Sequence, residues 1–176
     1  MIKDVSEKPV IGITVGDPAG IGPEIVIKAL LDPTISHACR PFLIGDLSNL
    51  EWTKEKLGLG ATFVDLGSEE GLEVIDLKNI DGEIEFGVES VATGRSAASN
   101  IESAVDLWKA GRIDAIATAP ISKNALKLAG YEFPGHTEFL AALTETDEFA
   151  MSFFAEKLRV VLLSTHVSLK DAITLV

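Results

Sequence analysis

Three short polar segments contain the residue types that could do chemistry in this chain. They are residues 118–123 (TAPISK), 135–138 (GHTE) and 164–166 (STH). The first and third follow apolar runs and the second precedes one, so the burial of apolar surface does not explain their composition. Imidazole, lysine and hydroxyl groups can transfer protons, neutralise anions or bind metal ions. These segments therefore hold the candidate functional residues.

His136 and Lys123 are the candidate catalytic residues. His136 could donate a hydrogen bond to a substrate oxygen or transfer a proton, and the alternative is a surface histidine at a turn. Lys123 follows a predicted strand, at the end where open α/β sheets bind ligands, and could neutralise a phosphate or carboxylate. The alternative for Lys123 is an ordinary solvated lysine. Thr137 could cap the helix predicted over residues 139–143.

His166 is the candidate metal ligand. It follows the apolar run 158–164, and a neutral imidazole at the end of a strand can bind a divalent cation. A catalytic metal usually takes about three protein ligands, so one histidine is not a complete site. Asp171 could orient a metal ligand or begin a helical turn as a solvated acid. His37 lies in no comparable cluster and is expected to be structural.

A glycine-rich segment, residues 16–24 (GDPAGIGPE), links the first predicted strand to the first predicted helix. Its glycines could let the backbone approach a ligand closely, and the N-terminus of the helix offers free N–H groups to an anion. The alternative is a sharp turn from strand to helix. The spacing is not the GxGxxG pattern of a dinucleotide-binding turn.

The apolar residues alternate between strand-like and helix-like spacing along the chain. Strands are predicted at residues 10–15, 41–45, 63–66, 72–77, 113–119 and 158–164. Helices are predicted at residues 23–31, at 47–57, and from a cap at Ser96 to about Gly111. Largely apolar strands alternating with helices predict an α/β fold, with a mostly parallel sheet flanked by helices on both faces. We expect a first α/β domain over residues 1–125 and the beginning of a second over residues 126–176.

Composition and charge argue against several classes of function. The chain has 176 residues, 47% of them hydrophobic, with 15 Lys and Arg against 27 Asp and Glu. A formal charge of −12 argues against nucleic acid or an anionic membrane as a partner. Cys39 is the single cysteine, so no internal disulfide can form. No secretory signal and no apolar run of roughly 18 residues is visible, so we expect a cytoplasmic chain.

Together these segments resemble the family of 4-hydroxythreonine-4-phosphate dehydrogenases, which act in pyridoxal phosphate biosynthesis. The resemblance covers essentially the whole chain and is most specific in residues 16–24, 118–123, 135–139 and 164–166. The first of these segments is also similar to the opening of isocitrate and isopropylmalate dehydrogenases. The resemblance implies their fold, with the second domain incomplete.

The resemblance implies NAD-dependent oxidation of the secondary alcohol of 4-phosphohydroxy-L-threonine, giving a β-keto acid that loses carbon dioxide. A divalent metal, zinc first and magnesium or cobalt otherwise, would stabilise charge on the developing carbonyl oxygen. By position, His136 and Thr137 match the family's substrate contacts, and His166 matches the first of its three metal histidines. Family members are homodimers, with the active site between two α/β domains and completed by the neighbouring subunit.

The resemblance also implies a chain longer than this one. Family chains continue beyond the position of Val176, and that part carries the other two metal histidines and most of the NAD site. Two alternatives to the leading function remain. One is a dehydrogenase of 4-phosphorylated threonate or erythronate, and the other is a non-catalytic module that binds a phosphorylated ligand.

Overall fold

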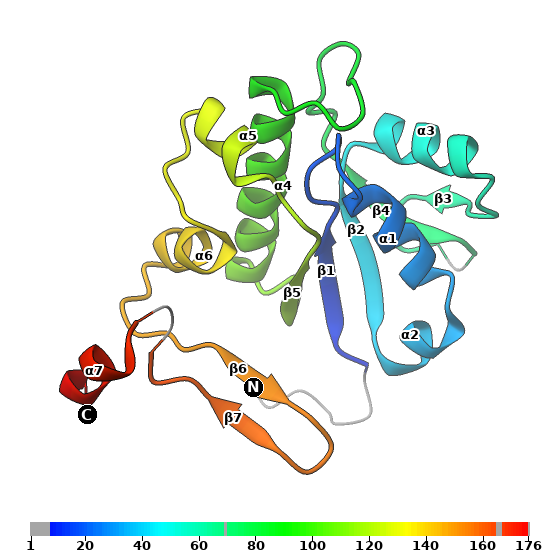
Figure 1. The fold of residues 1–176 in the computed structure, drawn as a ribbon. Coiled ribbons are helices and arrows are strands. Elements are labelled where there is room, and N and C mark those ends of the chain that lie inside the picture. Colours follow the sequence, from blue (N-terminus) through cyan, green and yellow to red (C-terminus); the bar gives the residue numbers. More distant parts are fainter. Residues whose placement is uncertain (1–7, 69, 165–166, 176) are drawn as a thin grey trace.

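A computed structural model describes residues 8–68, 70–164 and 167–175, and its centre is a five-stranded parallel sheet (Figure 1). The strands are β1 (Val10–Thr14), β2 (Arg40–Gly45), β3 (Phe63–Val64), β4 (Leu72–Asp76) and β5 (Ala115–Thr118). They lie in the order β3-β4-β2-β1-β5. The helices between them are α1 (Gly22–Leu30), α2 (Pro33–Ala38), α3 (Leu47–Leu57) and α4 (Val91–Lys109). The predicted α/β fold with a mostly parallel sheet is confirmed.

Two apolar layers hold helices against opposite faces of the sheet. On one face, α1 and α3 contribute Ile27 and Leu50 to a core shared with β2 and β4. On the other face, Ala104 of α4 packs in a cluster with Phe42 and Ile44 of β2. The central strands are therefore covered on both sides, which explains why their sequences are apolar without alternation. In the described part of the chain, no helix has the length and hydropathy needed to cross a membrane.

Helices α5 (Lys123–Leu128) and α6 (His136–Thr144) pack on α4 beside the β5 edge (Figure 1). Their shared core contains Ile101 of α4 and Phe139 of α6. Phe139 is 1% exposed and stacks on Phe133 with ring centroids 4.4 Å apart. The shared core holds α6 against α4, and the aromatic contact ties the start of α6 to the segment that precedes it. The domain division between residues 125 and 126 stays a prediction.

The prediction that Ser96 caps the long helix is wrong. Helix α4 begins earlier, at Val91, where Ser90 and Thr93 form a reciprocal capping box. Ser96 is buried inside the helix, and its hydroxyl donates to Asn79 Oδ1 at 3.0 Å. A serine just before apolar residues is typical of an N-cap, whereas here its hydroxyl is satisfied by a residue distant in the sequence.

The apolar run at residues 158–164 does not join the parallel sheet as predicted. Strand β7 (Arg159–Val161) pairs antiparallel with β6 (Ser152–Phe154) in a separate two-stranded sheet, drawn in orange in Figure 1. Phe154 and Val161 are 74% and 65% exposed. A short apolar run has the same pattern in a buried strand and in a hairpin, so periodicity could not separate the two.

Replacing Gly94 by Ala is expected to lower the free energy of unfolding by about 2 kcal/mol, because overpacking a tight contact costs that much. A Cβ on Gly94 of α4 would lie 1.9 Å from the carbonyl oxygen of Ala125 on α5, and backbone cannot rotate away. Urea unfolding followed by circular dichroism measures the change. Gly60→Ala is the control, because a Cβ there meets no described heavy atom within 4 Å. Equal effects of the two substitutions would contradict this close approach.

Candidate functional site

The carboxyl ends of β1 and β5 lie side by side at one edge of the sheet. Thr14 pairs with Thr118 at their last shared position, and the amide of Ala119 donates to the Thr14 carbonyl at 3.1 Å. Strand β1 continues into the glycine-rich segment 16–24, and β5 continues into segment 118–123. Parallel pairing therefore brings the glycine-rich segment and the polar segment 118–123 together.

The glycine-rich segment lies directly against the residues that follow β5. Gly16 has a φ of +74°, and a Cβ there would lie 2.3 Å from the carbonyl oxygen of Pro120. The amide of Asp17 donates to the same oxygen at 2.9 Å. At the start of α1, a Cβ on Gly22 would lie 2.2 Å from the Val15 carbonyl oxygen. Close backbone packing therefore requires both glycines, and direct contact of this segment with a ligand stays a hypothesis.

His136 is the first residue of α6 and contacts the residue that follows β5. One ring nitrogen hydrogen-bonds to the backbone of Ala119, whereas Nε2 is buried without a partner in the described part of the chain. Burial lowers the pKa of the imidazole, and the Ala119 bond opposes that shift. Since this bond favours the charged form, the ring donates it, and Nε2 of the neutral ring carries a lone pair. The Nε2 atom can therefore accept a proton or a hydrogen bond from a ligand.

Lys123 lies beside the turn that leads into His136. It is the first residue of α5, and the N-cap Ser122 accepts a hydrogen bond from the Ala125 amide at 3.0 Å. A Cβ on Gly135 would lie 3.8 Å from Lys123 Cε. The structure thus brings together the segments of the two candidate catalytic residues, and their catalytic roles stay predictions.

Thr137 does not cap the predicted helix, which was the structural alternative for its hydroxyl. It lies exposed in the first turn of α6, whose N-cap is Gly135, and no side chain caps this helix. The apolar run begins at Phe139, whereas α6 begins three residues earlier, at His136. Thr137 therefore lies inside the helix and not before it. A role for the Thr137 hydroxyl in binding substrate stays a prediction.

The predicted metal ligand His166 lies outside the described residues. Asp171 is exposed in the first turn of α7 (Leu169–Ala172), where its carboxylate accepts from Ser168 Oγ at 2.6 Å. His37 is exposed in the last turn of α2. Within residues 8–68, 70–164 and 167–175, no group of three or more His, Cys, Asp or Glu could hold a metal ion. The described donors alone therefore do not form a metal site.

Two carboxylates near the segment 118–123, those of Asp17 and Glu89, were given no functional role from the sequence. The pKa of Asp17 is raised, chiefly by burial and in addition by the negative charge of Glu89. The hydrogen bond that Asp17 accepts from the Ala19 amide at 2.9 Å partly opposes this shift. Exposed Glu89 accepts from Ser122 Oγ and from Asn124 Nδ2 at 2.5 Å, and these bonds lower its pKa. Asp17 could have been noted as an acid within the glycine-rich segment. Glu89 gave no signal, because it lies in an irregular stretch.

A chain of side-chain amide hydrogen bonds ties the glycine-rich segment to α4. Asn100 Nδ2 donates to the Gly16 carbonyl at 3.4 Å, and Asn79 Nδ2 donates to Asn100 Oδ1 at 2.9 Å. Asn79 Oδ1 in turn accepts from Ser96 Oγ. Ser96 and Asn100 lie four residues apart on the buried face of α4, and polar residues at that spacing on an apolar face were the signal that sequence reasoning missed.

Comparison with known proteins identifies the relatives of this chain. The family model described as pyridoxal phosphate biosynthetic protein PdxA matches residues 37–176. The chain belongs to the PdxA family. Its relatives include the D-threonate 4-phosphate dehydrogenase of Cupriavidus necator, which is 43% identical over 172 residues. That match covers 94% of this chain and 52% of the relative.

Solved structures of two dehydrogenases share this fold. The 4-hydroxythreonine-4-phosphate dehydrogenase from Burkholderia phymatum has a TM-score of 0.90 and 41% identity, covering 96% of this chain and 53% of its own. The one from Klebsiella pneumoniae has a TM-score of 0.83 and 37% identity, covering 97% and 54%. The chain therefore spans about half the length of the relatives that it matches, and the expected family resemblance is confirmed.

The imidazole of His136 is expected to titrate below pH 6.5, because burial disfavours its charged form. The unfolded chain then binds this proton more readily than the folded chain, so the fold loses stability as the pH falls through 6.5. Proton–carbon NMR of the imidazole measures the midpoint, with the signal assigned from the spectrum of His136→Gln. A midpoint above 6.5 would contradict the burial of the ring.

Proposed function

We propose that this chain contributes to an NAD-dependent dehydrogenase that oxidises the secondary alcohol of a 4-phosphorylated four-carbon hydroxy acid. The observation that carries the proposal is the buried Nε2 of His136, which has no partner among the described residues and lies beside Lys123 at the carboxyl edge of the sheet. Membership of the PdxA family supports dehydrogenase chemistry. Family resemblance also supports a homodimer in which the partner subunit completes the site.

In this proposal His136 handles the proton of the substrate hydroxyl and Lys123 binds the charged end of the substrate. His136 Nε2 accepts the hydrogen bond of the substrate hydroxyl and then its proton, because the lowered pKa keeps the free ring neutral. Lys123 neutralises the carboxylate or phosphate of the substrate. The exposed Thr137 hydroxyl, in the same turn of α6 as His136, donates a hydrogen bond to a substrate oxygen. When bound, NAD would supply the acceptor for the hydride that leaves the carbinol carbon. The product is a β-keto acid, which loses carbon dioxide.

A divalent metal belongs to the proposal, with His166 as one ligand, zinc as the first expectation and magnesium or cobalt as the others. When bound, such an ion would polarise the alcohol oxygen and stabilise charge on the developing carbonyl oxygen. Since the described residues do not supply a set of three donors, no step assigned to His136 or Lys123 depends on the metal.

Two substrates compete within this proposal. D-threonate 4-phosphate is favoured by the name of the 43% identical relative from Cupriavidus necator. 4-Phosphohydroxy-L-threonine, the substrate that the sequence resemblance implied, is favoured by the family model and by the names of the two solved structures. The second differs from the first in carrying an ammonium group in place of a hydroxyl beside the carboxylate.

Replacing His136 by Gln in the full-length gene product is expected to lower kcat at least about 100-fold, because proton transfer by a positioned side chain contributes that much. NADH formation is followed with metal supplied, and circular dichroism checks the fold. His37→Gln is the control, because that histidine is exposed at the end of α2. Unchanged turnover in His136→Gln would refute the assigned role.

The ratio of kcat/KM for the two substrates decides between them. We expect the full-length gene product to oxidise D-threonate 4-phosphate at least about tenfold more efficiently, since a site built for a hydroxyl leaves an ammonium poorly paired. Preference for the amino acid would reverse the choice of substrate. Binding of both compounds without NADH formation, with metal present, would instead support the non-catalytic module.

A further inference from the structure

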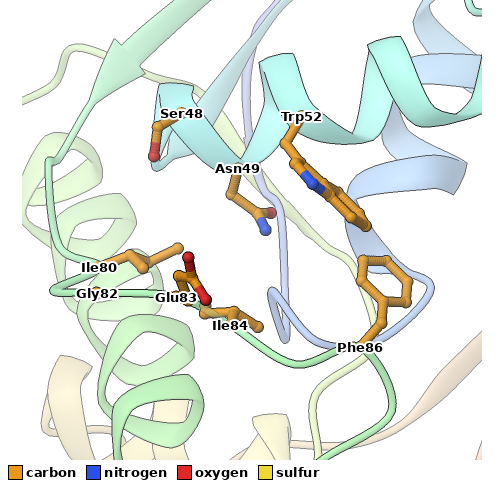
Figure 2. Close-up of a pocket in the computed structure, with 8 residues that line it drawn as sticks. All are labelled: Ser48, Asn49, Trp52, Ile80, Gly82, Glu83, Ile84 and Phe86. Atoms are coloured by element: carbon orange, nitrogen blue, oxygen red, sulfur yellow. The ribbon is translucent and has the colours of Figure 1, made fainter.

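A hollow lies on the same edge of the sheet as His136, beside β2 and β4. It is a pocket of about 520 Å³ between helix α3 and the loop that follows β4 (Figure 2). It shares no lining residue with the place around His136 and Lys123. The residues that line it are Ser48, Asn49, Trp52, Ile80, Gly82, Glu83, Ile84 and Phe86.

Hydrogen bonds at both ends hold the loop in place. The amide of Ile80 donates to Asp46 Oδ2 at 3.2 Å, and the amide of Gly87 donates to the Ala19 carbonyl at 2.8 Å. The first bond ties the loop to the N-cap of α3, and the second ties it to the glycine-rich segment. The pocket is therefore formed before any ligand arrives, so binding does not require the loop to be ordered.

An aromatic pair forms one side of the pocket. Trp52 of α3 and Phe86 of the loop are stacked with ring centroids 5.0 Å apart (Figure 2). Each side chain nevertheless remains 45% exposed. Exposed aromatic faces attract flat rings by stacking and cations by the negative charge of the ring face.

A buried hydrogen-bond acceptor on α3 completes the pocket. Asn49 is 9% exposed, and its Nδ2 donates to the Pro18 carbonyl at 3.2 Å, which fixes the orientation of the amide. Its Oδ1 has no partner in the described part of the chain. Figure 2 shows the Asn49 side chain pointing from α3 toward the loop. Because a buried acceptor without a partner costs free energy, a ligand N–H group at this position would be stabilised.

The charge of the residues that line the pocket favours a positively charged ligand. Glu83 contributes a carboxylate from the loop that faces α3 (Figure 2). None of the eight described residues that line the pocket is Lys or Arg. An anionic ligand would meet repulsion without compensation, whereas a cation would meet a carboxylate, an amide oxygen and two aromatic faces.

We propose that this pocket binds a small organic ammonium ion with an aromatic body. The ring of the ligand stacks on the Trp52–Phe86 pair, and the ammonium group donates to Asn49 Oδ1 and to the Glu83 carboxylate. The proposal does not depend on dehydrogenase activity, because it uses residues apart from His136 and Lys123.

Three probes with the same phenyl body test the selection by charge: 2-phenylethylamine, 2-phenylethanol and phenylacetate. Each is titrated into the protein and followed by the nitrogen–proton NMR signals of the Trp52 indole and the Asn49 amide, with the Trp108 indole as an internal control. The amine is expected to bind at least about tenfold more tightly than the alcohol, and phenylacetate less tightly than either. Equal affinity of amine and phenylacetate, or no shift at Trp52 with about 20 mM amine, would overturn the proposal.

A pair of variants on the same loop tests the carboxylate. Glu83→Gln keeps the shape of the side chain and is expected to weaken amine binding about fivefold to tenfold, without changing the affinity for the alcohol. Glu85→Gln removes the same charge from a residue that does not line the pocket, and it should leave both affinities unchanged. Equal loss in the two variants would mean that the net charge of the chain attracts the amine, and the proposed site would be wrong.

Discussion

The candidate site depends on a backbone contact that leaves no room for a side chain. The chain at Gly16 lies against Pro120 so closely that an added Cβ would fall 2.3 Å from a carbonyl oxygen. Neither segment can withdraw without disturbing the pairing of β1 with β5, since both continue directly from those strands. Ala119, which holds the His136 ring, and Ser122, which caps the helix of Lys123, belong to the segment fixed by this contact. One close approach therefore positions both candidate catalytic residues.

Buried polar atoms without partners gather at the same edge of the sheet. In the described residues these side-chain atoms are Thr14 Oγ1, Asn49 Oδ1 and His136 Nε2. Thr14 ends β1, Asn49 lies in the first turn after β2, and His136 contacts the residue after β5. Protein interiors rarely tolerate such atoms, because each one loses its bonds to water without replacement. Their concentration where parallel strands end marks that edge, rather than either helical face, as the place for ligands.

Local chemistry made some elements predictable, and long-range packing hid others. Helix α3 has its predicted bounds, because Asp46 at its start and Gly58 at its end carry capping signals within the sequence itself. The approach of Lys123 to Gly135 could not be predicted from any short stretch of sequence, since it depends on how α5 and α6 pack on α4. The role of Ser96 was also hidden by a long-range contact. Its hydroxyl bonds to Asn79, which lies in a loop distant in the sequence, so capping was the only explanation that neighbouring residues suggested.

The two candidate sites on this edge of the sheet differ in the charged groups that surround them. Charges on this chain beyond about 8 Å are largely screened at physiological ionic strength, so the nearest groups decide which ions bind. Near His136 the ammonium of Lys123 and the uncapped N-terminus of α6 attract anions, whereas the carboxylates of Asp17, Glu89 and Glu138 repel them. Of the described residues that line the pocket beside β2 and β4, Glu83 is the one with a charged side chain. An organic cation is therefore favoured beside β2 and β4, whereas a phosphorylated acid near His136 depends on Lys123 and the N-terminus of α6 to offset the neighbouring carboxylates and the net charge of −12.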